Sequence, residues 1–229
     1  MINKKFAATL ICLVTSCSAF CQQHYESNIA IGVKAGATLS KTMFTPKIEQ
    51  GFTKGFISGV AFKYIEERHF GVIAELNFQQ RGWREKFDET NYYFERKLTY
   101  IQVPLLAHIY FGSDRFKAFF NAGPEIGFNL GDSSSANFNY NNLDDLPSDL
   151  PMSNRNTEQY TMPVKNKIDY GISAGLGAEL KLKDRHSVSI EGRAYYGLNS
   201  IFSDRKKDVF AGSNGLSFMV TAGYWFRVK

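Results

Sequence analysis

The sequence predicts an all-β fold, a closed antiparallel transmembrane β-barrel of about eight strands in an up-and-down meander. Most of the chain divides into segments in which apolar and polar residues alternate. The connections between these segments are alternately short and long. After the N-terminal leader, no apolar run approaches the roughly 20 residues that a spanning helix needs. A closed barrel is the other structure that lipid admits.

The alternating segments are typical of barrel strands. In the clearest of them, every even position from Ala118 to Leu130 is apolar, whereas Lys117, Asn121 and Glu125 hold odd positions. Because successive side chains of a strand point to opposite faces, one face is apolar and the other largely polar. The eight segments lie near residues 29–39, 53–65, 69–81, 97–111, 116–130, 167–181, 187–198 and 216–228.

The lengths of the connections separate a membrane barrel from a soluble β-sandwich, which also shows alternation. Three connections have only three or four residues: 66–68, 112–115 and 183–185. They alternate with four longer ones, near 40–52, 82–96, 131–166 and 199–215. Outer-membrane barrels sort their loops in this way, with tight periplasmic turns and longer outside loops. An even number of strands then predicts that both termini are periplasmic.

The N-terminus has the features of a secretory signal: Lys4 and Lys5 precede an apolar stretch and a run of small residues that ends at Cys21. Cleavage after Cys21 is expected, and a lipid on Cys17 is the alternative. The predicted division is a signal peptide at 1–21, a short N-terminal leader at 22–28 and an outer-membrane barrel domain at 29–229.

Composition excludes several classes of function. All three cysteines, Cys12, Cys17 and Cys21, lie in the signal, so the mature chain can form no disulfide or thiolate metal site. The signal holds two lysines and no acid, so the net charge falls from +5 to +3 in the mature chain. That balance is too mild to indicate nucleic-acid binding.

The polar face of the segments predicts a charged barrel interior. An eight-stranded barrel is only wide enough for side chains to fill it, and unpaired charges there would be costly, so acids and bases should pair. We expect a polar plug rather than an ion path or a binding cleft. The predicted interior residues are Lys34, Lys63, Glu75, Lys117, Glu125, Asp169, Glu179, Lys181, Glu191, Arg193 and Arg227.

Aromatic residues of the apolar face gather beside the short turns. Such a girdle is typical of the level of the lipid headgroups. The alternative is aromatic residues scattered through a core. The predicted girdle consists of Phe62, Tyr64, Phe70, Phe111, Phe116, Tyr224 and Phe226.

Several short motifs together resemble the PorT-like outer-membrane β-barrel family. They are residues 100–106 (YIQVPLL), 123–127 (GPEIG), 169–171 (DYG) with 175–177 (GLG), and 223–226 (GYWF). The resemblance covers nearly the whole mature chain, although each motif alone is weakly specific. It implies an outer-membrane barrel, and some relatives are tied to the assembly of a protein-secretion system. The basic tail at 227–229 departs from the pattern, since many barrels end on an aromatic residue.

The histidines and serines do not form a recognisable catalytic or metal motif. Of His24, His69, His108 and His186, only His108 lies within a predicted strand, and no H-x-x-H or H-E-x-x-H spacing occurs. Ser187 and Ser189 are near His186, but adjacent strand residues face opposite sides. No metal or other cofactor is therefore expected, and a lipid hydrolase is kept only as a minor alternative.

The connection from 131 to 166 is rich in Asp, Asn and Tyr. Loops of this length are usually functional or disordered. Solvated flexibility is the expectation here, and binding of a cation or glycan is the alternative.

Two prolines fall inside predicted strands. Pairing across residues 112–115 would set Phe111 opposite Phe116 and Pro104 opposite Gly123. Because proline has no N–H for the ladder, we expect a bulge or break there, with a water or an interior polar group such as Gln102 or Glu125 satisfying the freed carbonyls.

The sequence thus predicts a structural or accessory barrel embedded in outer-membrane lipid, associated with other envelope or secretion proteins. A binding or adhesion barrel that acts through its loops is the alternative.

Overall fold

The computed structural model describes residues 27–87, 90–142, 147–148, 156–202 and 209–228. The expected signal peptide and Cys17 lie outside these residues. Among those described, no helix is long and apolar enough to cross a membrane. The strands are β1 (Asn28–Thr45), β2 (Gln50–Gly51), β3 (Thr53–Ile65), β4 (Phe70–Lys86), β5 (Tyr93–Gly112), β6 (Phe116–Ala136), β7 (Ile168–Lys183), β8 (His186–Ser200) and β9 (Gly212–Arg227).

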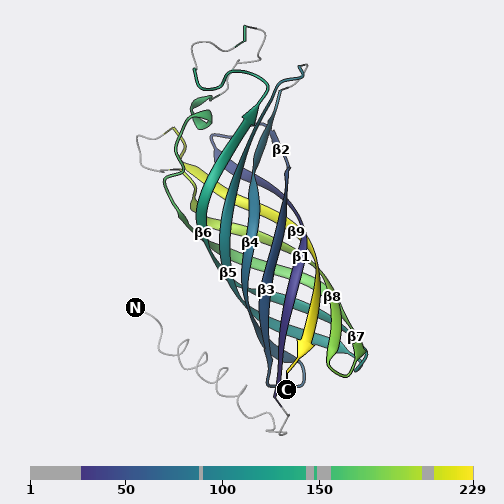
Figure 1. Cartoon of the computed structure of the whole chain (residues 1–229). Coiled ribbons are helices and arrows are strands. Elements are labelled where there is room, and N and C mark those ends of the chain that lie inside the picture. Colours follow the sequence, from purple (N-terminus) through teal and green to yellow (C-terminus); the bar gives the residue numbers. More distant parts are fainter. Residues whose placement is uncertain (1–26, 88–89, 143–146, 149–155, 203–208, 229) are drawn as a thin grey trace, which may run out of the picture.

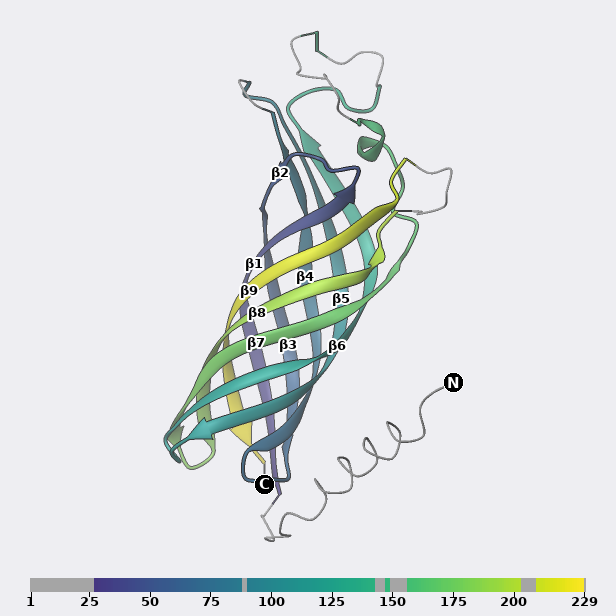
Figure 2. The same cartoon turned by 180° about the vertical axis from the view of Figure 1, so that it is seen from behind.

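The eight long strands close into a ring in which every neighbouring pair is antiparallel (Figures 1 and 2). Consecutive strands pair from β3 to β9, and β1 pairs with both β3 and β9. The two-residue β2 adds to the far end of β4. The closed antiparallel meander predicted from the sequence is confirmed.

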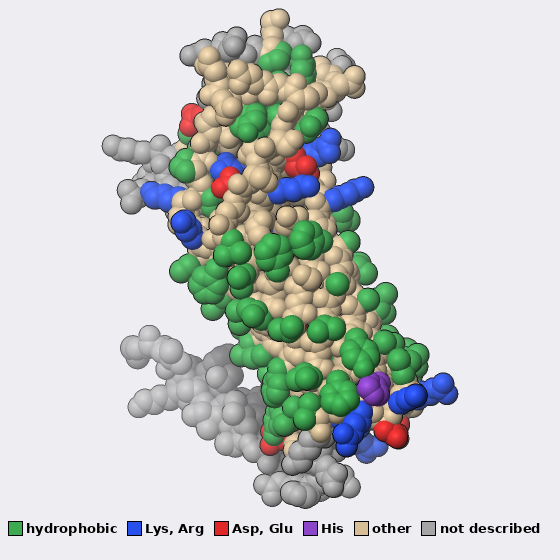
Figure 3. All heavy atoms as spheres, in the orientation of Figure 1, with side chains coloured by type: hydrophobic (Ala, Val, Ile, Leu, Met, Phe, Trp, Pro, Cys, Tyr) green, Lys and Arg blue, Asp and Glu red, His purple; other side chains and the backbone are tan. Residues whose placement is uncertain are grey.

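The outer surface of the ring is apolar. Leu176 and Val220 are 67% and 58% exposed, respectively. Figure 3 shows hydrophobic side chains over the middle and lower part of the barrel, with lysine, arginine and acidic side chains gathered above and below them. Side chains so exposed would be unfavourable in water and are the expected contacts of lipid chains.

A wide depression of about 680 Å³ lies on this outer surface, between Val33, Phe62, Leu76 and Tyr224. It crosses β9, β1, β3 and β4, and its walls are apolar side chains of the lipid-facing side. Lipid chains would fill it, so it is part of the membrane contact.

Several strands are longer than the sequence indicated. Strand β5 has 20 residues and β6 has 21, whereas about 9–11 residues are enough to span a bilayer. The expected ends at 39, 81 and 130 were too early, and the expected starts at 97 and 216 were too late. The extensions keep their ladder pairing beyond the apolar band, as between Lys97 and Ser133.

The hairpin between β5 and β6 differs from the predicted register by two residues. Gly112 pairs with Lys117, so Phe111 lies opposite Ala118 rather than Phe116. The turn is residues 113–116, where Ser113 N donates to Phe116 O at 2.8 Å. Gly112 precedes it with a φ of 134°, which glycine adopts without strain.

As a result, Pro104 lies opposite Glu125, not Gly123. The ladder does break near both prolines. Pairing between β4 and β5 is interrupted beside Pro104, and pairing between β5 and β6 beside Pro124. The register is the same on both sides of each gap, so these are breaks without a bulge. The bulge in this hairpin lies farther up, at residues 99–100.

Neither Gln102 nor Glu125 is hydrogen-bonded to a freed carbonyl among the described residues. Within the described part of the chain, the side-chain amide of Gln102 makes no hydrogen bond, and Glu125 accepts one from Ser173 Oγ.

Charge placed on the outer face should destabilise the barrel far more than charge in an outside loop. We expect Leu176→Arg or Val220→Arg to cost about 2–4 kcal/mol near the bilayer midplane. Asn139→Arg, at an exposed loop position, should change the unfolding free energy by less than about 0.5 kcal/mol. Urea unfolding of the protein folded into lipid vesicles measures both. Equal effects of the two classes would contradict the assignment of faces.

Candidate functional site

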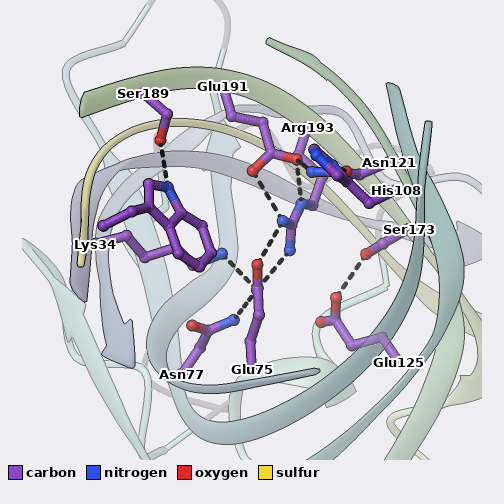
Figure 4. A network of polar contacts seen from close by, with 11 residues as sticks. Lys34, Glu75, Asn77, His108, Asn121, Glu125, Ser173, Ser189, Glu191 and Arg193 are labelled. Atoms are coloured by element: carbon purple, nitrogen blue, oxygen red, sulfur yellow. Dashed lines mark hydrogen bonds and ion pairs between the residues drawn. The ribbon is translucent and has the colours of Figure 1, made fainter. Parts of the chain in front are cut away.

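The interior of the barrel is crossed by a buried ion-pair network (Figure 4). Its centre is a bidentate pair in which Arg193 Nη1 and Nη2 donate to the two carboxylate oxygens of Glu75, each at 2.8 Å. Glu75 belongs to β4 and Arg193 to β8, which are four strands apart in a ring of eight. The pair therefore spans the bore between opposite walls. Such planar two-point contacts are among the strongest charged hydrogen bonds.

Neighbouring strands extend this network around the bore. Lys34 of β1 and Asn77 of β4 both donate to Glu75 Oε2. On the other side, Arg193 pairs with Glu191 of its own strand, at 2.8 Å from Nη2 to Oε2.

The network continues through two uncharged side chains. Asn121 of β6 donates to Glu191 at 2.9 Å, and its Oδ1 lies 2.7 Å from His108 Nδ1 on β5. Interior polar atoms of five strands are thus joined in one hydrogen-bonded assembly.

Two further ion pairs cross the bore at other levels. Lys63 of β3 pairs with Glu179 of β7, again between opposite walls. Arg81 of β4 pairs with Asp169 of β7. Strands β3 and β4 are neighbours in the ring, and so are β7 and β8. The ion pairs join these two pairs of strands and therefore brace the barrel across its diameter.

Aromatic rings cover the cations of these pairs. The guanidinium of Arg81 lies 3.8 Å from the ring centroid of Tyr100 and 4.7 Å from that of Tyr195, and Tyr195 Oη donates to Asp169 at 2.8 Å. A ring face attracts a cation, and more strongly where water is excluded. Lys63 Nζ lies 4.1 Å from the Trp225 ring in the same way.

Seven of the predicted interior residues are buried, and four sit where the bore opens. Lys34, Lys63, Glu75, Glu125, Asp169, Glu191 and Arg193 are each at most 8% exposed. Glu179, Lys117, Lys181 and Arg227 are half-buried at the end with the short turns. Glu179 pairs with Lys63, but among the described residues Lys181 and Arg227 form no ion pair, so the expectation that all interior charges pair is wrong for this end. Water reaches it and lowers the cost of an unpaired charge.

Sequence reasoning missed three charged interior residues. Arg81 has the parity of Glu75 and lies in the predicted segment 69–81, so its position alone could have revealed it. Glu85 and Arg96 lie beyond the predicted strand ends. There the apolar Trp83 and Phe94 also face inward, so alternation of polarity does not mark the two charged residues.

The bore is filled between these residues. Two interior spaces, beside Glu75 and beside Arg81, each leave about 10 Å³ for the centres of water-sized molecules. One water needs roughly 10–15 Å³ on this measure. The described interior therefore holds space for single waters but no continuous channel at these levels.

The end with the long loops is closed by part of the 131–166 connection. Its short 3-10 helix η3 (Glu158–Tyr160) is held over the mouth by two charged residues. Arg96 Nη1 donates to Met162 O at 2.6 Å, while Glu85 accepts from Gln159 Nε2 at 2.8 Å and from Tyr160 Oη at 2.9 Å. Gln159 and Tyr160 are at most 2% exposed. Solvated flexibility is thus the wrong description for this part of the connection.

Beneath η3, the mouth holds an aromatic cluster that joins strands and loops. Trp83 packs edge-on against Phe44 and Phe202, at centroid distances of 5.2 and 5.8 Å. Phe94 lies 4.5 Å from the ring of Tyr160. The buried members are Phe44, Ile48, Trp83, Phe87, Phe94, Leu98, Tyr100, Tyr160, Ile201, Phe202 and Phe210.

The predicted aromatic girdle lies on the outer surface beside the short turns. Tyr64 and Phe226 are half-buried there. Phe62, Phe70, Phe111, Phe116 and Tyr224 are exposed, by 41–59%.

The candidate hydrolytic residues do not form a nucleophile–base pair. His186 Nδ1 contacts Tyr224 Oη, Ser187 donates to Glu179 and Ser189 accepts from Trp225 Nε1. Among the described residues, no group of three His, Cys, Asp or Glu side chains is placed to hold a metal ion.

A closed eight-stranded ring with an apolar exterior and a polar, braced interior defines the class of outer-membrane β-barrels. The chain belongs to the outer membrane protein beta-barrel domain family, whose model matches residues 20–203. No curated protein sequence matches it.

Three solved outer-membrane structures are similar over most of the chain. Neisserial surface protein A has a TM-score of 0.46 and 15% identity, and the match covers 86% of this chain and 97% of that one. OprG of Pseudomonas aeruginosa has a TM-score of 0.46 and 13% identity, with coverages of 89% and 98%. Ail of Yersinia pestis, in complex with the heparin analogue sucrose octasulfate, has a TM-score of 0.40 and 13% identity, with coverages of 88% and 100%.

Removing the central cation should strongly destabilise the barrel. Arg193→Leu leaves Glu75 and Glu191 buried without their main partner, and breaking a buried pair in this way costs about 3–5 kcal/mol. Arg68→Leu, at an exposed short turn, should cost less than about 0.5 kcal/mol. Urea unfolding in vesicles compares the two, and a loss below about 1 kcal/mol for Arg193→Leu would show that the network does not brace the bore.

Removing the ring of Tyr160 should open the mouth without unfolding the barrel. We expect Tyr160→Ala to loosen the connection and speed its cleavage by added protease at least ten-fold, because both the ring packing and the bond to Glu85 are lost. Tyr160→Phe keeps the packing and loses only the hydroxyl, worth about 0.5–1.5 kcal/mol, so its effect should be smaller. Equal cleavage of wild type and Tyr160→Ala would contradict the described cap.

Proposed function

We propose that this protein is a non-conducting structural or accessory barrel of the outer membrane, a scaffold for other envelope or secretion proteins. The observation that carries the proposal is the braced and filled bore beneath a covered mouth. A pore needs a continuous water path, and a solute-binding barrel needs an interior space of ligand size. Rigid strands with a solid interior suit a protein that holds partners.

We place the short turns and both termini in the periplasm. Support comes from the ends of the barrel: Val228 N donates to Ile29 O at 2.7 Å, so the first and last strands end side by side. The three short turns lie at that same end (Figure 1). Outer-membrane barrels keep their tight turns in the periplasm.

The resemblance to PorT-like barrels supports a link with a secretion system. A partner in the same envelope complex is the interaction that we propose on this ground.

Loop-mediated binding or adhesion is the second candidate. The observation in its favour is the ordered outside end, where β4, β5 and β6 extend past the apolar band and η3 is fixed in place. A barrel-borne lipid hydrolase is third, and the contacts of His186, Ser187 and Ser189 give it no support.

Conductance tests the non-conducting part of this proposal. In planar bilayers, the folded protein should give no steady current steps, because its bore lacks a water path. Removing the cap residues 156–162 should leave it non-conducting, since the ion pairs below remain. Regular ohmic channels from the wild type would refute a scaffold with a filled bore.

Capture from detergent-solubilised membranes separates the first two candidates. The scaffold should retain a stoichiometric envelope partner after the loop residues 137–142 are replaced by Gly and Ser. Loss of the partner in this loop variant, with the SDS mobility shift on heating preserved, would favour the loop-binding function instead.

A further inference from the structure

The end of the bore with the short turns opens into a recess that we call the short-turn vestibule. Lys63, Glu179 and Trp225 line its deep part, and Lys117, Lys181 and Arg227 line the part nearer the turns. The turn arginines Arg115 and Arg185 complete the wall.

This vestibule is larger than the other interior spaces described above. It leaves about 40 Å³ for the centres of water-sized molecules, against roughly 10–15 Å³ needed by one water. A space for about three waters also fits one small tetrahedral oxyanion.

The charge of the wall is unbalanced. Six lysine and arginine side chains face three aspartate and glutamate side chains, which leaves an excess of three positive charges. Glu179 is already paired with Lys63. The other two acids, Asp114 and Asp184, lie on exposed turns.

Two half-buried cations in the wall have no acidic partner among the described residues. Within the described residues, neither Lys181 nor Arg227 forms a salt bridge or a side-chain hydrogen bond. They come from β7 and β9, and their backbones bind the two turns: Lys181 N donates to Arg115 O at 2.9 Å, and Arg227 N to Arg185 O at 2.8 Å. The strand ends and turns therefore hold four cations around one opening.

Lys117 adds a further positive charge from β6. Its Nζ lies 4.4 Å from the centroid of the Tyr110 ring, and its ladder partner is Glu179. An anion in the vestibule would be surrounded by cations from three strands and two turns. Such convergence is the arrangement that recognises a phosphate group.

We infer that the short-turn vestibule is a binding site for a phosphate group, either free phosphate or the headgroup phosphate of an anionic lipid. Lys181 and Arg227 are the residues that bind it, and Lys117 adds long-range attraction. The opening lies at the end of the barrel, beside the aromatic girdle, so both sources reach it.

The test uses the full mature protein in nanodiscs. Binding of inorganic phosphate is measured by calorimetry in discs of phosphatidylcholine, at constant ionic strength set with chloride. The test variant is Lys181→Gln/Arg227→Gln. The matched control is Arg68→Gln/Lys183→Gln, which removes two exposed charges at the same end of the barrel but outside the vestibule.

We expect saturable phosphate binding by wild type and control, weakened at least ten-fold in the test variant. If phosphate does not bind in neutral discs but discs with phosphatidylglycerol raise the thermal midpoint of wild type and control alone, the source is a lipid headgroup. Both results support the site. Phosphate also stabilises proteins generally, so only the difference between the two variants counts.

No saturable binding and no lipid effect, or equal behaviour of the two variants, would overturn the proposal. Binding of an acidic peptide without any response to phosphate or phosphatidylglycerol would overturn it as well. The SDS mobility shift on heating checks that each variant is folded. If the double variant does not fold, Lys181→Gln and Arg227→Gln are measured singly by the same criterion.

Discussion

The pairing of charge across a narrow bore is the constraint on which the rest of this structure depends. A lysine, arginine or carboxylate that points into an eight-stranded barrel loses its contact with water. The free-energy cost of this desolvation is offset only when a partner of opposite charge is close and well oriented. Glu75 meets Arg193 from the opposite wall, and Lys63 meets Glu179 in the same way. These pairs fix which strands face each other, and they fill the space through which a solute would pass.

The two ends of the bore differ in how far water is excluded from the interior charges. At the end with the long loops, the aromatic rings of Trp83, Phe94 and Tyr160 exclude water from the ion pairs beneath them. Arg96 and Glu85 then satisfy the backbone and side-chain groups of η3 that this burial would otherwise leave unpaired. At the end with the short turns the buried apolar cluster is smaller, consisting of Ile65, Tyr110 and Phe119, and charged side chains beside it remain in contact with water.

Much of the fold follows from parity, and parity was readable in the sequence. The register of the β5–β6 hairpin was misjudged by two residues, yet each side chain was assigned to its correct face, because a slip of two preserves the alternation. The slip changed which residues pair across the hairpin, but it did not change the face on which each side chain lies. The turn begins and ends one residue later than expected. It follows Gly112, whose positive φ is a backbone property that residue type alone did not specify.

Strand ends and the cap were beyond the same reasoning. Trp83 and Phe94 extend β4 and β5 because they pack against Tyr160 and Phe202, which come from distant connections. That packing is a contact between segments more than 60 residues apart in the sequence, and local alternation carries no trace of it. Most interior charges within the predicted strands could be recognised one by one, because parity alone places each of them on the inner face. Which acid meets which base depends on the ring order, as with Arg81 and Asp169.

The distribution of unpaired charge follows from the same constraint. Deep in the bore, Lys34, Lys63, Arg81 and Arg193 each contact a carboxylate, because an isolated cation there would cost several kcal/mol. Lys181 lies close to the paired Glu179 on β7, and Arg227 lies at the end of β9. Both are half-buried, and water screens them. An excess of positive charge is tolerable at that depth because water reaches it. A half-buried, positively charged recess is stabilised most by a mobile anion, since the anion supplies the partner that the described residues do not provide.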